Sequence, residues 1–226
     1  MRAEIHEGNG LQYITVVPDG YTPDSSYPLV VMLHGFGANM QDLAGLAPTI
    51  NADGYVYACP NAPIPFQLGP GQSGFGWMTP RGGGPPEETA NSEQLLSDFF
   101  DAVFKQFNVE PGRAVLLGFS QGGGMTYRCG LGRADHFAGL AALSATLPDQ
   151  DELAARLPEG RGQSIFIGHG RFDQMVSDDS AQSAKTFLES NGYIPEFHIY
   201  DMAHEISGEE LADLVPWMAK VLPPKD

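Results

Sequence analysis

The sequence predicts an α/β protein built on a mostly parallel sheet with helices on both faces. Two observations carry this prediction. From about residue 29 to the end, short apolar runs typical of buried strands alternate with segments of helical periodicity. One of these runs leads into Ser120, which is surrounded by glycines, as in a sharp turn between a strand and a helix. A chain of 226 residues suits one such domain, and we assign residues 1–226 to it.

The predicted strands are short, rich in apolar and β-branched residues, and bounded by turn residues. Residues 11–17, which alternate between polar and apolar side chains and are rich in β-forming residues, make the first of them. The continuous apolar run at 29–33 indicates a strand that is buried on both faces. The remaining predicted strands are 54–59, 114–117, 137–143, 164–168 and 194–200.

Helical periodicity marks the segments between these strands. The clearest helix is 91–107, whose apolar side chains recur at helical spacing and make one broad face. Shorter helices are predicted at 121–131, 151–157 and 177–190. A last helix begins after Ser207, which forms the pattern of a capping box with Glu210, and Pro216 should bend it.

The segment 60–86 has no predicted helix or strand. It is rich in glycine and proline but also carries several large apolar side chains, so it is too apolar for a disordered linker. A loop of this length in a compact domain is usually functional. We interpret the segment as a folded flap over a binding groove.

Composition excludes several classes of partner. The formal net charge of −16 disfavours nucleic acid and anionic membrane surfaces. The N-terminus lacks the apolar run of a signal peptide, and no stretch is apolar enough to span a bilayer or serve as a membrane anchor. Cys59 and Cys129 are predicted to be free buried thiols, and no Cys/His spacing suggests zinc. We therefore expect a cytoplasmic enzyme.

The pentapeptide Gly118-Phe119-Ser120-Gln121-Gly122 matches the G-x-S-x-G pattern of a nucleophile elbow. Such an elbow holds its serine in a strained backbone conformation, so that the hydroxyl projects from the sheet. The flanking glycines lack the bulk that would keep strand and helix apart. A plain glycine-rich turn is the alternative, because patterns of five residues recur by chance.

A serine nucleophile needs a carboxylate and a histidine on other loops at the carboxyl ends of strands, in the order Ser, acid, His. Asp173 follows the strand at 164–168, and His204 follows the strand at 194–200. His204 is predicted to take the Ser120 proton and return it to the leaving group. Asp173 is predicted to hold the imidazole tautomer and stabilise its cation.

Other histidines and acids fit these roles less well. His198 lies inside a predicted strand, from which it does not easily reach the loop face. His34 and His169 sit beside glycines at strand ends, where buried turn histidines with satisfied nitrogens are also found. Asp178 and Asp179 fall in the first turn of a helix, where acids are common because of the helix dipole.

Ester chemistry at Ser120 also requires two donors for an oxyanion. The backbone N–H of Gln121 follows the nucleophile at a helix N-terminus and is suited by geometry. The second donor should come from the loop after the strand at 29–33, where the backbone N–H of Phe36 is the candidate. A glycine turn with one packed phenylalanine is the alternative for that loop.

Several motifs together resemble the phospholipase/carboxylesterase family of the α/β-hydrolases, which includes acyl-protein thioesterases and bacterial carboxylesterases. They are Leu33-His34-Gly35-Phe36-Gly37, Asn61-Ala62-Pro63 with Trp77, Gly118-Phe119-Ser120-Gln121-Gly122-Gly123, Gly168-His169-Gly170 with Asp173, and Met202-Ala203-His204-Glu205-Ile206. The resemblance covers nearly the whole chain. It implies a Ser120/Asp173/His204 triad, oxyanion donors at Phe36 and Gln121, and hydrolysis of esters, thioesters or lysophospholipids without a cofactor or metal.

The chain departs from the pattern of this family in a few places. The family commonly has Ala at the position of Gly124 and Gly at that of Ala203, and relatives often have Asp where Asn39 stands. An aromatic residue and an acid often follow the tryptophan, where this chain has Met78 and Thr79. This last departure lies in the flap and concerns substrate preference instead of the chemistry.

The predicted substrate is a short-to-medium-chain carboxylic ester. Only about twenty residues separate the strands at 137–143 and 164–168, which leaves no room for an inserted cap domain. The cleft should therefore be open, with the flap as its main wall. The candidates for substrate-binding residues are Phe66, Leu68, Phe75, Trp77 and Met78, of which about half should only anchor the flap.

Three functions are compared at this stage. We favour a serine carboxylesterase; an acyl thioesterase or lysophospholipase with the same triad is the alternative. The third is a non-catalytic binding module, but such modules generally lose a triad residue. The predicted partner is a small-molecule ester, and a homodimer is left open.

Overall fold

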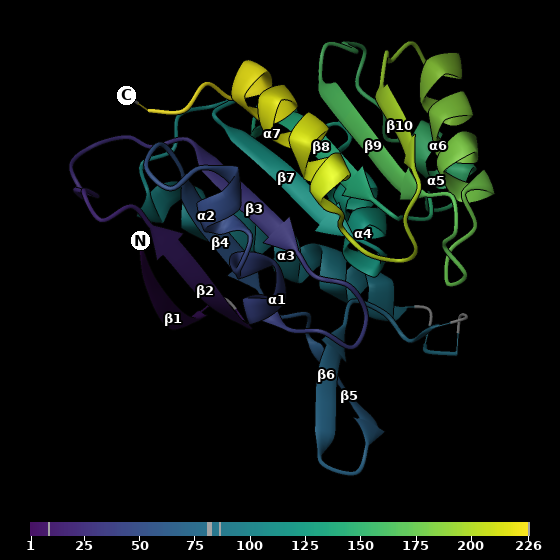
Figure 1. The fold of residues 1–226 in the computed structure, drawn as a ribbon, viewed down its shortest axis with the longest axis horizontal. Helices are drawn as coiled ribbons and strands as arrows, with labels where there is room; N and C mark the ends of the chain where they lie inside the picture. Colours follow the sequence, from purple (N-terminus) through teal and green to yellow (C-terminus); the bar gives the residue numbers. More distant parts are fainter. Residues whose placement is uncertain (9, 81–82, 86, 226) are drawn as a thin grey trace.

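The structure, a computed structural model, describes residues 1–8, 10–80, 83–85 and 87–225. Its centre is an eight-stranded sheet (Figure 1). In spatial order the strands are β1 (Arg2–Gly8), β2 (Leu11–Val17), β4 (Val56–Pro60), β3 (Leu29–Leu33), β7 (Ala114–Phe119), β8 (Phe137–Leu143), β9 (Ser164–Gly170) and β10 (Glu196–Tyr200). The pairs β1/β2 and β2/β4 are antiparallel, whereas all pairs from β4 to β10 are parallel. The prediction of a mostly parallel sheet is confirmed.

Helices cover both faces of this sheet, as predicted (Figure 1). On one face lie α1 (Met40–Ala44), α2 (Ala47–Ile50) and α7 (Gly208–Val221). On the other lie α3 (Glu87–Gln106), α4 (Gln121–Gly130), α5 (Gln150–Ala154) and α6 (Asp179–Ser190). The sheet divides the core in two: along β3, Val31 belongs to the α3 and α4 side, whereas Val30 and Met32 belong to the α7 side. All of β3 is buried, in agreement with its continuous apolar sequence.

Besides two strands within the segment 60–86, three elements are absent from the sequence prediction. Strand β1 is a largely exposed edge strand with a charged sequence, so it carries no apolar alternation. Helices α1 and α2 have five and four residues, which is too short for helical periodicity to be recognised. The largest boundary difference concerns the predicted helix 91–107, which begins at Glu87 in the structure. The predicted strand 164–168 continues to Gly170, so His169 lies inside this strand instead of after it.

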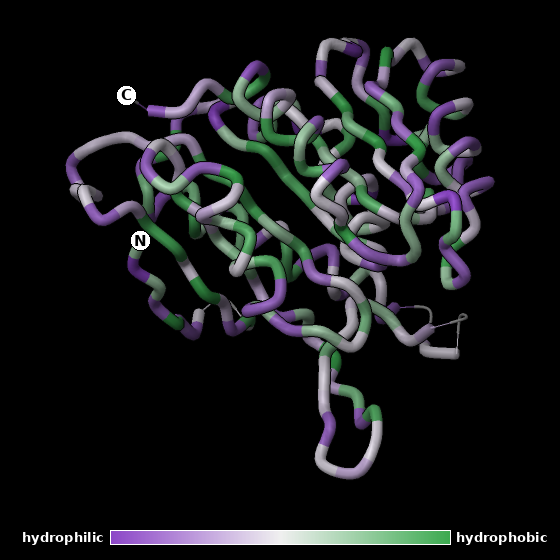
Figure 2. The backbone as a smooth tube through the Cα atoms, in the orientation of Figure 1, coloured by the Kyte–Doolittle hydropathy of each residue, from purple (hydrophilic) through white to green (hydrophobic). Residues whose placement is uncertain are grey.

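The predicted flap contains a hairpin of β5 (Ile64–Gly69) and β6 (Gln72–Gly76). This hairpin projects away from the body of the molecule (Figure 1), whereas its base is hydrogen-bonded to the loop after β3, because Phe75 bonds to Gly37 and Ala38. The segment is therefore folded, as expected, but the outer part of its hairpin does not lie over the body. Its outer part is mostly polar and exposed (Figure 2), and therefore has little apolar surface with which to pack onto the body. Residues 81, 82 and 86 of the predicted flap lie outside the described residues.

The start of α7 confirms half of the predicted capping box. The Ser207 hydroxyl accepts a hydrogen bond of 3.2 Å from the Glu210 N–H. The Glu210 side chain does not complete the box, because it is fully buried against Gly168 and neither of its oxygens has a partner among the described residues. Apolar contacts of the helix thus place this carboxyl in the core.

Two further predictions are confirmed. The chain between β8 and β9 contains only α5, so no cap domain is inserted there. Cys59 and Cys129 are both buried and free. Across residues 1–8, 10–80, 83–85 and 87–225, none of the helices has both the length and the apolar character needed to cross a membrane.

Candidate active site

Ser120 lies on the tight turn between β7 and α4, at the carboxyl end of the sheet. Its backbone has φ 55° and ψ −118°, a conformation that residues other than glycine rarely adopt. The Ser120 N–H donates a hydrogen bond of 2.8 Å to the Leu143 carbonyl at the end of β8, which holds the turn against the neighbouring strand. The strained elbow expected from the sequence is present.

Glycines make this turn sterically possible. A Cβ atom at Gly118 would overlap the Gly122 carbonyl, and a Cβ atom at Gly122 would overlap the Leu33 carbonyl. On the neighbouring loop, a Cβ atom at Gly35 would lie 3.3 Å from the Ser120 Cβ. Larger residues do not fit at positions 118 and 122, which accounts physically for the spacing of the G-x-S-x-G pattern.

The side chains of Ser120, His204 and Asp173 form one hydrogen-bonded chain. His204 Nε2 lies 2.9 Å from Ser120 Oγ, and His204 Nδ1 lies 2.6 Å from Asp173 Oδ2. With its proton on Nδ1, the imidazole donates to the carboxylate and leaves the Nε2 lone pair for the serine hydroxyl. The Phe119 ring packs beside the imidazole, with a centroid separation of 4.8 Å. The structure thus brings together three residues that come from three separate loops.

The Asp173 carboxylate is fully buried and each of its oxygens is hydrogen-bonded. Oδ1 accepts from the N–H groups of Met175 and Val176 at 2.8 and 2.9 Å, while Oδ2 faces His204. Burial raises the pKa of Asp173, but the hydrogen bonds from Val176, His204 and Met175 together lower it by more, so the pKa lies below its ordinary value. Asp173 is therefore an anion at neutral pH and can stabilise a cationic imidazole.

Two backbone donors border Ser120. The N–H groups of Phe36 and Gln121 donate no hydrogen bond to another described residue. The loop that carries Phe36 is fixed by His34, whose Nδ1 donates to the Gly35 carbonyl at 2.7 Å and whose Nε2 accepts from the Ala62 N–H at 3.0 Å. Burial lowers the pKa of His34 to about 4, so this ring is neutral. It can therefore donate through one nitrogen and accept through the other, which holds the loop in place.

The side chain of Gln121 makes contacts that the sequence analysis missed. Its Oε1 accepts from the Trp77 N–H at 2.6 Å and its Nε2 donates to the Met78 carbonyl at 2.8 Å. The same residue thus offers its N–H to the site and fixes the chain that follows the hairpin. The glutamine of the elbow motif was the available signal, because an amide can both donate and accept.

Comparison with known proteins shows the family of the chain. Residues 21–222 match the sequence profile of the phospholipase/carboxylesterase family. The chain belongs to the phospholipase/carboxylesterase family. It is accordingly a serine hydrolase that acts on esters.

Individual members of this family and of related groups cover most of the chain. The chain is 30% identical over 214 residues to acyl-protein thioesterase 1 of Aspergillus fumigatus, covering 87% of this chain and 89% of the relative. It is 27% identical to feruloyl esterase C of Emericella nidulans, covering 84% and 66% of the two chains. The crystal structure of esterase PE8 superimposes with a TM-score of 0.78 at 22% identity, covering 92% and 97%. This last likeness shows the α/β-hydrolase fold.

The structure corrects the prediction that Trp77 binds the substrate. Trp77 is fully buried, and its indole N–H donates to the His34 carbonyl at 2.9 Å. Its carbonyl accepts from the buried Ser92 hydroxyl at 2.6 Å. Trp77 therefore has no surface for a substrate. Its hydrogen bonds tie the chain after the hairpin to the loop after β3 and to α3.

The other predicted substrate-binding residues are divided between the core and the surface. Phe75 and Met78 are half-buried and pack against the α3 side of the core. Phe66 packs edge-to-face on Phe36, with ring centroids 4.8 Å apart, and Leu68 is 47% exposed. Of the five candidates, burial therefore excludes Trp77 alone, whereas Leu68 is exposed and Phe66, Phe75 and Met78 each keep part of their surface.

Exposed apolar residues also flank the acid, and the sequence analysis missed them. Phe172 is 58% and Met175 is 78% exposed, on either side of Asp173 in the loop after β9. Phe36, beside the elbow, is 38% exposed. The signal in the sequence was the large apolar side chains in the loop that carries the acid, since such a loop is otherwise polar.

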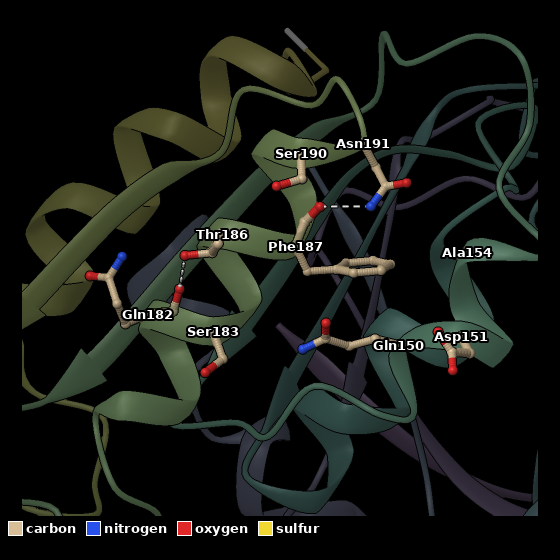
Figure 3. A pocket seen from close by; sticks show the side chains of 9 residues that line it. All are labelled: Gln150, Asp151, Ala154, Gln182, Ser183, Thr186, Phe187, Ser190 and Asn191. Carbon is tan, nitrogen blue, oxygen red and sulfur yellow. Dashed lines mark hydrogen bonds between the residues drawn. The ribbon is translucent and has the colours of Figure 1, made fainter.

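Two surface cavities lie away from Ser120. One, of about 470 Å³, separates α5 from α6, and Figure 3 shows side chains of both helices around it. Polar groups of its lining bond back to their own helix, as Thr186 does to the Gln182 carbonyl and Asn191 to the Phe187 carbonyl. The other, of about 630 Å³, is lined by residues near the amino ends of β8 and β9, among them Phe137 and Gln163. The site is thus identified by its chemistry and not by the size of a cavity.

The alternative histidines have other partners. His198 lies within β10, half-exposed, beside Glu196 and Asp213. His169 is fully buried, with Nε2 bonded to the Val176 carbonyl at 2.9 Å. Among the side chains that the structure describes, no three His, Cys, Asp or Glu residues are grouped so that they could hold a metal ion.

Proposed function

We propose that this protein is a serine carboxylesterase that hydrolyses short-to-medium-chain esters through a Ser120/His204/Asp173 triad. The observation that carries the proposal is the hydrogen-bonded chain from Ser120 Oγ through His204 to Asp173, with distances of 2.9 and 2.6 Å, on a strained elbow. The backbone N–H groups of Phe36 and Gln121, which have no partner among the described residues, supply the donors that an oxyanion needs.

Acylation follows from this arrangement. His204 Nε2 takes the Ser120 hydroxyl proton while Oγ attacks the ester carbonyl carbon. The carbonyl oxygen becomes an oxyanion, which accepts from the N–H groups of Phe36 and Gln121. When the ester C–O bond breaks, the imidazolium returns the proton to the departing alkoxide, and the acyl group remains on Ser120.

Deacylation repeats the same steps with water. His204 takes a proton from a water molecule, whose oxygen attacks the acyl carbon, and the C–Oγ bond of the second tetrahedral intermediate breaks. The proton returns to Ser120 and the carboxylic acid leaves. Asp173 stays ionised throughout and stabilises the imidazolium, in agreement with its lowered pKa.

The preference for short-to-medium acyl groups rests on the surroundings of Ser120. The hairpin projects away from the body and no cap domain is inserted, so these elements do not enclose a long acyl chain (Figure 1). The exposed apolar side chains of Phe36, Leu68, Phe172 and Met175 offer limited apolar contact beside the site. Small apolar groups are therefore the acyl chains that fit best.

A series of p-nitrophenyl esters of increasing acyl length tests this proposal, with Ser120→Ala as the blank. We expect the highest kcat/KM below about twelve carbons and no turnover by Ser120→Ala. A fluorophosphonate probe should label the native enzyme at Ser120 only. An optimum at longer chains contradicts the substrate assignment, and unlabelled Ser120 would favour a non-catalytic binding module.

An acyl thioesterase is the second candidate, because relatives such as the Aspergillus fumigatus protein are named acyl-protein thioesterase 1. The same triad can attack either bond, so the distinction lies in the leaving group. Turnover of an oxygen ester and a thioester with the same acyl chain decides between them, and lysophospholipid is the third substrate to include. A cytoplasmic location and a homodimer stay predictions.

A further inference from the structure

Besides His204, a second histidine touches Asp173, and this one is fully buried. His169 Nε2 lies 2.9 Å from the Val176 carbonyl oxygen and 3.4 Å from Asp173 Oδ2, and both side chains are fully buried. Oδ2 is the oxygen that also binds His204. His169 therefore approaches the triad from behind, on the buried side of the carboxylate.

The partners of its ring indicate which form His169 takes. Nδ1 is buried and has no partner among the described residues, whereas Nε2 faces two oxygens that can only accept. A proton on Nδ1 would leave a buried donor unsatisfied, which costs about 1–3 kcal/mol. The arrangement therefore favours the neutral ring with its proton on Nε2, which donates to Val176 and, more weakly, to Asp173.

His169 also closes a ring of contacts around the acid. Its Nε2–H holds the Val176 carbonyl, while the Val176 N–H donates to Asp173 Oδ1 at 2.9 Å. Val176 is thus held through both its carbonyl and its N–H, which fixes the turn from Asp173 to Val176. Without His169, the carboxylate loses one direct contact and the support of a second donor.

We propose that His169 is a positioning residue, which acts through Asp173 to set how strongly the acid holds the imidazolium of His204. This inference rests on the proposed function, in which Asp173 is the acid of the triad. A carboxylate with more donors is a weaker base and attracts the imidazolium less. His169 thereby keeps His204 ready to release its proton to the leaving group.

The charged surroundings of His169 are simple. Asp173 is the one acid that the described residues place within 4 Å of its ring, and His204 lies beyond that acid. On the neighbouring strand β10, the residue paired with it is Ile199, which is uncharged. Changes at His169 should therefore reach the triad through Asp173 alone.

The test compares His169→Phe with His169→Gln, which keeps an N–H donor. Two quantities are measured: the acidic limb of the pH profile of kcat/KM, and the midpoint of the His204 ring titration by NMR. In His169→Phe we expect both to move up by about 0.5 pH unit or more, with a lower kcat, because Asp173 has lost donors. In His169→Gln both should return close to the native values.

His198→Phe is the matched control, because His198 lies on β10 and faces Phe166 and α7 on the other side of the sheet. It should leave both midpoints unchanged. A loss of thermal stability in His169→Phe without movement of the midpoints, or movement to lower pH, would overturn the proposal. The NMR titration needs no turnover, so it decides on His169 even if the esterase screen shows no Ser120-dependent activity.

Discussion

The side-chain amide of Gln121 accepts a hydrogen bond of 2.6 Å from the backbone N–H of Trp77. The residue that follows Ser120 is thereby joined to the chain at the end of the hairpin. The Met78 carbonyl completes the clamp by accepting from the same amide at 2.8 Å. The Gln121 side chain thus links the turn at Ser120 to the chain after the hairpin, and changes in one should affect the other.

We expect Gln121→Ala to lower the free energy of unfolding by about 2 kcal/mol, because it leaves a buried N–H and a carbonyl without partners. Urea unfolding measures this change. Limited proteolysis should also cut the hairpin faster. Gln67→Ala on the exposed face of β5 is the control, and equal proteolysis of both variants would contradict the clamp.

Gly122→Ala should destabilise the fold by about 3 kcal/mol or prevent folding, because its Cβ would overlap the Leu33 carbonyl. Gly124→Ala, two residues further along α4, is the matched variant. Its Cβ would lie 3.2 Å from the Thr146 carbonyl, and alanine favours the helix, so we expect a change within about 1 kcal/mol. Thermal unfolding of both proteins checks the contrast.

Asp173→Asn should reduce kcat by about 10³–10⁴-fold and leave the fold intact. The amide can still accept from Met175 and Val176 through its oxygen, but its NH₂ group then faces His204 Nδ1 and selects the wrong tautomer. Steady-state kinetics and circular dichroism measure the two effects. Asp178→Asn is the control, because the Asp178 side chain makes no capping hydrogen bond. Near-native turnover by Asp173→Asn would show that another residue is the acid.

His34 should make the protein sensitive to acid. Burial lowers the pKa of this ring to about 4, whereas the unfolded chain takes up the proton near its ordinary value of 6.5. The unfolded state therefore binds more protons between these values, and stability falls on the order of 3 kcal/mol as pH drops from 6.5 to 4. Urea unfolding across this range should show a shallower loss in His34→Gln than in the native protein or in His6→Gln.

Glu210 should have the opposite dependence. Burial raises its pKa to about 8, so the folded protein keeps a proton that the unfolded chain releases near 4.5. Stability should then fall as pH rises from 4.5 to 8, by on the order of 5 kcal/mol.

Glu210→Gln, which cannot ionise, removes this slope and should unfold at higher urea concentration than the native protein at pH 8. Glu209→Gln, one residue earlier and exposed, serves as the control. If stability depends on pH equally in Glu210→Gln and in the native chain, Glu210 does not contribute to this dependence and the prediction is wrong.

By itself, the sequence determined the α/β-hydrolase fold, the central strands and the identity of the residues around Ser120. These follow from local information: continuous apolar runs read as buried strands, and glycines at 118 and 122 mark a turn that no larger residue permits. The order Ser120, Asp173, His204 along the chain also follows from motifs at strand ends.

Only the tertiary structure decided what each side chain touches. Apolar sequence alone does not distinguish Trp77, which is buried and bonded to the His34 carbonyl, from Leu68, which is exposed on the hairpin, because both are large apolar residues of the same segment. The direction of the hairpin, the burial of Glu210 and the contact of His169 with Asp173 depend on residues far apart in the chain or on opposite sides of an element. Packing between distant segments sets these contacts, and they cannot be predicted from the local preferences of the sequence.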